Sequence, residues 1–500
     1  MAKELLPDTT RHPSRHEDHE DEEPTQLPPY CALPQTEKVG YIILASLVTT
    51  LGPLSGNIYL PALDSLSRDL HTSHSTINLS ITLFLIFQGL APLLTANLSE
   101  HNGRRPILLV CLASYVLVNV ALSLQTNVPA LFVLRCLQSV GSSGVSVVAM
   151  AVIADLVTRA DRGKYVAYAS IGMTVAPVLG PVLGGVFTQF LGWRSIFVFL
   201  AILATLLAAM ILAVMPETCR GIVGNGSIRP QWWNRSCRQR FWPETIPDSR
   251  HDQDPSTQLR IRRRPSLWDT FHVMRDPSTA LVISAGMLMM SGHMAILVSI
   301  PLLFAANYGF NSLHIGLCYL PYAVGGLVAR WTVGSLADRN YRRHGTRAGL
   351  RIVQNHQAPE ELQAIPLERV RLQLTLPFLY ASALLVTLYG WLLHARVHVA
   401  GVFVLLSLLG NTLTGTQNTL NMLLIDLNAE RPAVAIASIA LFRSLSGAGV
   451  VAATLPVIRC IGVGWAATVI AGFWLTASLA LWLVYMYGHQ WRESRRDRAG

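Results

Sequence analysis

Two arginines occur inside long apolar stretches of this sequence, where a fixed positive charge is uncommon. Arg135 lies in the stretch near residues 128–155, and Arg443 lies in the one near residues 432–457. A charge at the middle of a membrane costs about 2.5 kcal/mol or more, so we expect each arginine to face a water-filled interior. Gln138 follows Arg135 by nearly one helical turn and can line the same face. The natural complement of such an arginine is an anion or a proton-sensitive partner.

Other polar side chains are scattered through the same kind of stretch, and each could line a cavity or bond a neighbouring helix. These side chains are Asn57, Gln88, His293, Asn411, Gln417, Asn418 and Asn421. As candidates for substrate binding and proton coupling we select Asn57, Gln88, Arg135, Gln138, Gln417, Asn418, Asn421 and Arg443.

The sequence contains no pattern that is typical of an enzyme. It has no nucleophile–base–acid set, no histidine or cysteine spacing for a metal, and no Gly-Lys-Ser/Thr loop that would hold phosphate in an ATP-driven pump. His12, His16 and His19 could bind a metal, but they lie in a polar tail whose composition favours disorder. We therefore predict no enzymatic activity, no metal and no cofactor.

Two charged segments in different halves of the chain look like copies of each other. Residues 97–106 and 334–343 both run from small or apolar residues through an acid to basic residues. Rim charges are costly unless they are paired, so we expect an acid–base cluster in each half. The expected members are Glu100, Arg104 and Asp155 in the first cluster, and Asp338, Asp426 and Arg339 or Arg342 in the second. Such clusters could latch two bundles together in one state, or they could only fix the topology.

The composition indicates which elements position these residues. Of the 500 residues, 51% are hydrophobic and 14% are charged, whereas soluble proteins carry about 25% charged residues. The apolar runs have the length of membrane-spanning helices, and a bilayer forces backbone groups to pair within each helix. We place spans near residues 39–61, 76–98, 106–125, 128–155, 164–190, 193–215, 279–305, 313–334, 374–395, 398–426, 432–457 and 464–486. This predicts an all-α membrane protein with twelve transmembrane helices in two pseudo-symmetric six-helix bundles.

The net charge of +10 is concentrated in alternate loops. This is the positive-inside pattern, which places both termini in the cytosol and argues against a nucleic-acid partner. We divide the chain into a disordered cytosolic tail at 1–38, an N-terminal bundle at 39–215, a cytosolic middle loop at 216–278, a C-terminal bundle at 279–486 and a basic cytosolic tail at 487–500. The middle loop has no apolar period, so we expect a flexible tether. The seven cysteines show no pairing pattern, and we expect free thiols.

The fifth span is rich in proline and glycine between residues 176 and 185. Membrane helices tolerate these residues where neighbouring helices satisfy the backbone, and small residues permit close helix contact. We expect a packing surface and a bend built from Pro177, Gly180, Pro181, Gly184 and Gly185.

Several stretches resemble one transporter family. Arg135-x-x-Gln138 resembles a motif linked to proton coupling, and Gly180-Pro181-x-x-Gly184-Gly185 resembles an antiporter motif. Further matching stretches are residues 55–63, 77–82, 88–92 and 366–372. Through nearly all its spans the chain resembles the major facilitator superfamily. Within it, the chain is most similar to fungal twelve-span drug:proton antiporters, in the branch with quinidine-resistance, polyamine and organic-acid exporters.

The chain departs from the family pattern in three places. The first charged segment lacks the usual Gly, Asp and Arg, the antiporter motif lacks one glycine, and an Asn-Asn pair expected before Arg443 is replaced. The residues found instead are Ala96, Glu100, His101, Ala176, Ile439 and Ala440. A polycation in a low-dielectric cavity also needs nearby carboxylates, and the predicted mid-membrane stretches have essentially none. We therefore expect an anionic or neutral cargo.

The resemblance implies a proton-coupled antiporter that exports a fungal secondary metabolite, toxin or drug by alternating access of its two bundles. Organic-acid export, of the citrate or itaconate kind, is the alternative. A polyamine exporter and a transport-inactive sensor also remain open. The implied partners are a small-molecule substrate, protons and the lipid bilayer, with no nucleic acid and a monomeric state. The expected location is the plasma membrane or the vacuolar membrane, crossed many times.

Overall fold

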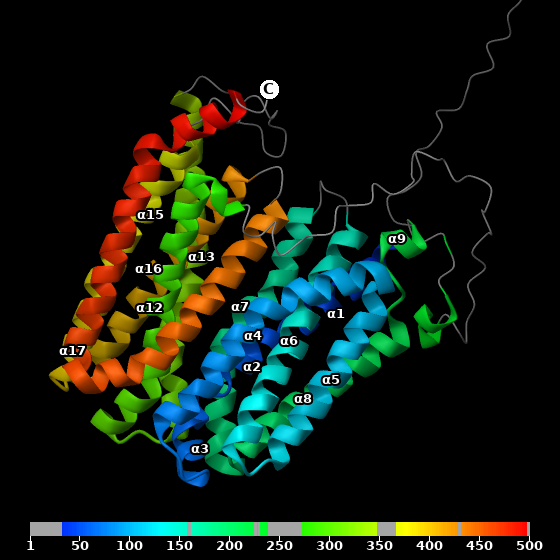
Figure 1. The fold of residues 1–500 in the computed structure, drawn as a ribbon, viewed down its shortest axis with the longest axis horizontal. Helices are drawn as coiled ribbons and strands as arrows, with labels where there is room; N and C mark the ends of the chain where they lie inside the picture. Colours follow the sequence, from blue (N-terminus) through cyan, green and yellow to red (C-terminus); the bar gives the residue numbers. More distant parts are fainter. Residues whose placement is uncertain are drawn as a thin grey trace, which may run out of the picture.

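The computed structural model describes residues 33–157, 162–224, 228, 231–238, 273–347, 367–428 and 432–497. Helices make up nearly all of these ranges, and no strand occurs within them. Figure 1 shows the helices as two bundles side by side, one from each half of the chain.

The N-terminal bundle begins with a span that is broken into short helices. α1 (Gln35–Thr49), α2 (Leu51–Asn57), η1 (Leu60–Ala62) and α3 (Leu63–Asp69) follow one another along it. Five long helices complete the bundle: α4 (His74–Asn102), α5 (Arg104–Leu124), α6 (Val128–Leu156), α7 (Arg162–Leu191) and α8 (Arg194–Val214).

The C-terminal bundle contains five long helices, of which the last covers two spans. They are α12 (Pro277–Tyr308), α13 (Ser312–Arg347), α15 (Leu367–His394), α16 (Val399–Leu427) and α17 (Pro432–Asp497). Gly462 interrupts α17 with a φ of 81° and a ψ of 164°, so the chain turns there and returns as a second helix. Glycine suits this turn because it has no Cβ to oppose a positive φ. Along the chain, the segment that connects the two bundles contains three short elements: α9 (Arg220–Val223), η2 (Trp232–Asn234) and η4 (Val273–Arg275).

The predicted fold class is confirmed. Each of the twelve expected spans coincides with a helix or helix series of the described ranges, when α17 is divided at Gly462. Several helices continue beyond the apolar run, as α13 does to Arg347. A helix needs no apolar sequence once it leaves the hydrocarbon, so hydropathy alone underestimates its length.

The two bundles touch along two helix pairs. α4 packs against α17, and α7 packs against α13. η1 and α3 add contacts to α12, so the chain turn after the first span also belongs to this interface. In Figure 1 the bundles meet near α3 and separate toward the end that carries α9 and the C terminus.

The small residues of α7 serve both kinds of contact. A Cβ on Gly184 would overlap the carbonyl of Ile58, just beyond the end of α2. A Cβ on Gly185 would instead lie 2.6 Å from the Ser312 carbonyl oxygen and 3.2 Å from the Gly316 Cα, both in α13. The expected close packing of this stretch is therefore present. One part of it joins α7 to its own bundle, and the other part joins the two bundles.

Replacing Gly184 by leucine should lower the thermal midpoint of the purified protein while leaving membrane insertion intact. The added side chain would force α7 away from Ile58, and overpacking of this kind costs about 1–3 kcal/mol. Gly472→Leu is the matched control, because nothing lies within 4 Å of a Cβ at that helical position. Equal thermal midpoints for the two variants would contradict this account of α7.

Candidate functional site

Arg135 of α6 lies in the core of the N-terminal bundle, with no exposed surface. Its Nη1 donates a hydrogen bond of 2.6 Å to Gln138 Oε1 and a longer one of 3.4 Å to the Ser55 carbonyl. Gln138 in turn donates from Nε2 to Asn119 Oδ1 of α5 at 2.7 Å. Arg135 and Gln138 therefore lie on one face of α6 as predicted, and the structure adds a direct hydrogen bond that fixes the orientation of the amide.

Two aromatic rings enclose the guanidinium group. The Arg135 Cζ lies 4.3 Å from the ring centroid of Tyr59 and 4.4 Å from that of Phe84. A desolvated cation–π contact contributes about 2 kcal/mol, which offsets part of the cost of burial. Nε and Nη2 have no hydrogen-bond partner among the described residues, so the rings do much of the stabilising. The expectation that Arg135 faces a water-filled interior is wrong in this structure, because aromatic side chains take the place of water.

Hydroxyl contacts tie this centre to the surrounding helices. The Tyr59 hydroxyl pairs with Ser80 at 3.0 Å, and the Ser55 hydroxyl pairs with Tyr115. Asn57 belongs to the same stretch, but its amide donates to the Pro53 carbonyl of its own helix at 2.7 Å. Asn57 is thus a local helix contact in this structure and does not join the Arg135 network.

Arg443 of α17 has a more open setting in the C-terminal bundle. Its Nη2 donates to Gln417 Oε1 of α16 at 2.7 Å and lies 3.6 Å from the Met290 sulfur of α12. Both Arg443 and Gln417 are half-buried. No carboxylate of the described ranges forms an ion pair with this arginine. The Gln417 amide thus accepts a hydrogen bond from the guanidinium but does not neutralise its charge. The half-buried guanidinium remains accessible to a further partner.

The remaining candidates make no hydrogen bond to either arginine. Gln88, Asn418 and Asn421 are half-buried, and their amides make no hydrogen bond to another described residue. Each amide is therefore free to contact water or a ligand.

Sequence reasoning gave little weight to His293, which lies in α12 one turn beyond Met290. Its Nδ1 is 2.5 Å from the Tyr322 hydroxyl of α13, and the side chain is half-buried. The only available signal was a histidine in an apolar run, which is not enough to identify a neighbour.

Acidic residues are excluded from the apolar parts of the helices. In the ranges that the structure describes, the carboxylates of the membrane helices lie at helix ends or in the polar extension of α13. The interior consequently carries two arginines and one histidine without a carboxylate to balance them.

The end of the bundles that holds Arg104, Arg220, Arg371 and Arg492 is called the basic end below. In the N-terminal bundle, Arg104 Nε pairs with Asp155 Oδ2 at 3.0 Å, and both side chains are largely buried. Arg104 also donates to the Ser99 hydroxyl at 2.7 Å. Glu100 is exposed and forms no ion pair within the described residues, so its expected place in this cluster is a wrong prediction for this structure.

Glu217, rather than the expected Glu100, is the buried acid beside Arg104. Its carboxylate is buried and accepts hydrogen bonds from the backbone N–H groups of Arg104, Arg105, Thr218 and Cys219, at 2.8, 3.2, 3.0 and 2.8 Å. It thereby satisfies unpaired N–H groups at the start of α5. Gly103 makes this approach feasible, because it has a φ of 100° and a Cβ there would lie 2.5 Å from a Glu217 oxygen. The sequence signal was a single acid at the end of the sixth span.

In the C-terminal bundle, the aspartate at the end of α16 pairs with an arginine that lies outside the copied segment. Asp426 pairs with Arg371 of α15 at 2.9 Å, so the expected partner, Arg339 or Arg342, is wrong for this structure. Asp338, Arg339 and Arg342 are all exposed.

The two copied segments differ because of one residue. The first copy turns at Gly103, whereas the second copy has Tyr341 at the equivalent place and stays helical within α13. Tyr341 lies under the Arg371 guanidinium, with its ring centroid 5.6 Å from Cζ. The second copy is therefore helical, and among the described residues Arg371, rather than a basic residue of this copy, forms the ion pair with Asp426.

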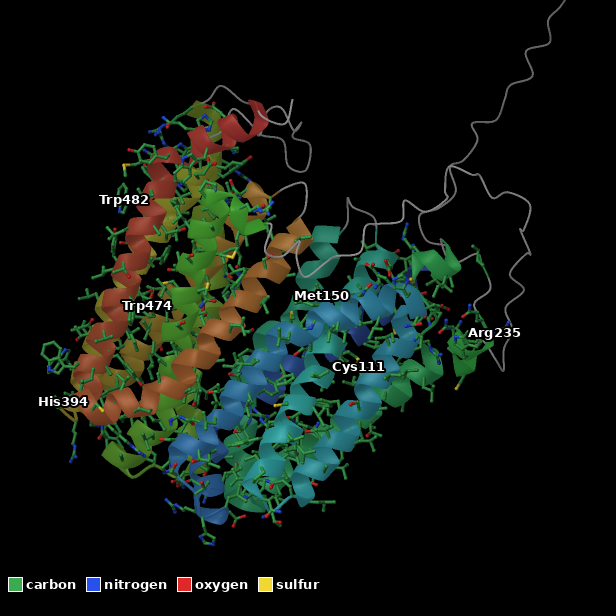
Figure 2. All side chains as sticks on the ribbon, viewed as in Figure 1. Cys111, Met150, Arg235, His394, Trp474 and Trp482 are labelled. Carbon is green, nitrogen blue, oxygen red and sulfur yellow. The ribbon has the colours of Figure 1, made fainter. Side chains whose placement is uncertain are left out.

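The start of the middle loop packs on the N-terminal bundle. Arg105 Nη1 donates to the Trp233 carbonyl at 3.5 Å, and Arg238 pairs with Glu37 of α1 at 2.6 Å. Asn234 and Ser236 are buried. Figure 2 shows Arg235 of this segment beside the N-terminal bundle, on the side away from the C-terminal bundle. The interpretation as a flexible tether is therefore wrong for residues 216–224 and 231–238, while residues 225–227, 229–230 and 239–272 lie outside the described ranges.

Cysteine and metal chemistry add no site in the part of the chain that the structure describes. The cysteines there are free thiols, and no group of three potential metal ligands occurs. Cys31, His12, His16 and His19 lie outside the described residues.

Comparisons with known proteins identify the family to which this chain is similar. The family model described as Major Facilitator Superfamily matches residues 45–452. The MFS-type transporter clz19 of Cochliobolus lunatus is 38% identical over 96% of this chain and 90% of its own length. Citrate exporter 1 of Aspergillus niger is 31% identical over 95% of this chain and 90% of its own.

A solved structure has the same fold. The xylose transporter XylE from E. coli, in a partially occluded inward open conformation, superimposes with a TM-score of 0.59 at 14% identity. The match covers 90% of this chain and 98% of XylE.

The aromatic enclosure of Arg135 predicts that lysine cannot replace it. A compact ammonium does not fill the planar space between Tyr59 and Phe84, so Arg135→Lys should lose about 2 kcal/mol of stability. Arg443→Lys is the control, because Arg443 contacts an amide and a thioether rather than two rings, and its loss should be smaller. Thermal unfolding of the purified variants measures both values. A stable Arg135→Lys protein would rule out this role for the rings.

The ion pair at the basic end predicts different effects for two aspartates. Asp426→Asn leaves Arg371 without its carboxylate and should cost about 1–2 kcal/mol, since the pair is partly exposed. Asp338→Asn changes an exposed side chain and should stay within about 0.5 kcal/mol of the parent. Thermal midpoints at low and high salt give the comparison. If Asp338→Asn proved to be the more damaging change, the assignment of partners would be incorrect.

Proposed function

The chain belongs to the Major Facilitator Superfamily and is a multi-pass membrane transporter, and we propose that it exports a small organic molecule in exchange for protons. The expected cargo is a fungal secondary metabolite, toxin or drug that is anionic or neutral. The site consists of Arg443, Gln417 and the free amides Gln88, Asn418 and Asn421.

One observation carries the choice of cargo. The apolar parts of the described helices contain no carboxylate, while Arg443 keeps a half-buried positive charge that only an amide balances. A polycation such as a polyamine would meet repulsion here, with no acid to offset its desolvation. An anion or a neutral polar molecule would complete the hydrogen bonds of the guanidinium instead.

The packing of the bundles supports alternating access as the mechanism. The contacts between the bundles run along α4–α17 and α7–α13 and extend to η1 and α3. At the basic end, the pairs Arg104–Asp155 and Arg371–Asp426 each lie within one bundle. We propose that rocking about the two helix contacts opens and closes the basic end, and that these pairs keep each bundle rigid while it moves. By the positive-inside rule, the basic end faces the cytosol, whether the protein lies in the plasma membrane or in the vacuolar membrane.

Organic-acid export is the second candidate, and two observations favour it. A relative at 31% identity is named a citrate exporter, and Arg443 offers the guanidinium that binds carboxylates well. The two candidates differ in the charge of the cargo, so a single assay separates them.

The decisive test is export from vesicles that contain the purified protein and an imposed proton gradient. Citrate, a neutral aromatic drug and spermidine are compared as cargoes. We expect proton-dependent export of the drug, of citrate or of both, and no export of spermidine. Arg443→Ala should abolish citrate export and reduce drug export less, because the charge matters to the anion.

The matched control is Arg459→Ala, which removes an arginine from an exposed position near the end of the same span. Spermidine export that survives Arg443→Ala would overturn the proposal and favour a polyamine exporter. Failure to move any cargo would favour a transport-inactive sensor.

A further inference from the structure

His293 and Tyr322 form a hydrogen-bonded pair in the interior of the C-terminal bundle. The distance from Nδ1 to the Tyr322 hydroxyl oxygen is 2.5 Å, which fixes the imidazole ring between α12 and α13. The other ring nitrogen, Nε2, makes no hydrogen bond to any described residue, and the histidine is only half-buried. Nδ1 therefore anchors the ring. When Nδ1 carries the hydrogen of the neutral ring and donates it to the Tyr322 hydroxyl, Nε2 is the nitrogen that takes up a second proton.

Arg443 lies beside this pair. Met290 precedes His293 by one helical turn, and its sulfur lies 3.6 Å from Arg443 Nη2 and 3.9 Å from Gln417 Nε2. Among the charged or titratable groups of the described helices packed on α12, Arg443 of α17 and Tyr322 of α13 are the ones that act on His293. α16 contributes only the neutral Gln417 at this level. A proton on His293 would thus add a second positive charge to a site that already has one.

We propose that His293 is the proton-binding residue of this transporter, and that with Arg443 it forms a site for organic anions whose affinity rises when His293 is protonated. Histidine is the side chain whose ordinary titration falls between about pH 5 and 8, and the described membrane interior offers no carboxylate for this task. The inference rests on the proposed function, because it assumes that protons and an organic molecule share one transport cycle.

The sign of the coupling follows from the charges. Protonated His293 and Arg443 repel each other, and an anion between them relieves that repulsion. By reciprocity, anion binding must favour protonation by the same factor as protonation favours anion binding. A proton and an organic anion therefore occupy the site together. A neutral cargo that donates a hydrogen bond to Nε2 behaves in the opposite way, because protonation removes its acceptor.

Protonation of His293 thus has opposite effects on the binding of organic anions and of neutral hydrogen-bond donors. Exchange of cargo for protons requires that the two compete, and His293 provides competition for a neutral hydrogen-bond donor. An organic acid that uses the same site would carry the proton with it.

The test measures binding of an aromatic sulfonate to the full-length protein in detergent, because a sulfonate keeps its charge across the pH range used. Calorimetry at pH 5.5 and 7.5 gives the affinity, and buffers of different ionisation heat give the number of protons taken up. We expect affinity at pH 5.5 to be about tenfold higher, within the usual range of coupling between sites. We also expect proton uptake on binding at pH 7.5.

Three variants locate the effect. His293→Gln should bind equally at the two pH values, and no more tightly than the parent protein does at pH 7.5. Arg443→Gln should bind weakly at both pH values. His314→Gln, which changes an exposed histidine of α13, should behave like the parent protein.

Parent-like pH dependence in His293→Gln, loss of the dependence in His314→Gln, or no sulfonate binding by the parent would overturn the inference. If His293→Gln does not fold, proton uptake by the parent protein decides, and zero uptake would count against a shared site. If this inference failed, the parent protein would still export a neutral drug from vesicles. Failure of the inference is therefore distinct from failure of the proposed function.

Discussion

The cost of placing a charge in hydrocarbon governs this protein more than any other interaction. A positive charge there needs a partner, and the chain meets the need in two different ways. The N-terminal bundle encloses Arg135 between Tyr59 and Phe84 and leaves no exposed surface. The C-terminal bundle leaves Arg443 half-buried against the Gln417 amide. The first arginine is thus part of the architecture, and the second is available for binding.

The same constraint explains why the two halves are only pseudo-symmetric. In the first half, Gly103 permits a turn that brings backbone N–H groups to Glu217, and Arg104 then reaches Asp155. In the second half, the copied segment stays helical at Tyr341, and Asp426 pairs with Arg371 in the first turns of α15. Both halves therefore end with a paired aspartate, and in each half the arginine comes from the beginning of the third span of that bundle, α5 or α15.

These features divide the molecule into rigid parts and a variable part. Glycines of α7 fix close contacts to Ile58 and to α13, and the ion pairs at the basic end fix each bundle internally. The variable part, in our proposal, is a small group of polar side chains in the C-terminal bundle: Arg443 and Gln417 beside the Met290 sulfur, and His293 one turn further along α12. Because the described interior has no carboxylate, the proposal links the charge of the cargo to the protonation of His293.

The sequence by itself determined the membrane class, the twelve spans and the shared helix face of Arg135 and Gln138. Each of these depends on local spacing: a run long enough to cross a bilayer, or two side chains one turn apart. Tertiary structure alone decided that Arg135 is enclosed by rings, that Glu217 replaces Glu100, that Arg371 pairs with Asp426 and that His293 lies beside Arg443. Those contacts join helices far apart in the chain, and a hydropathy pattern fixes which residues enter the membrane without fixing how each helix is rotated toward its neighbours.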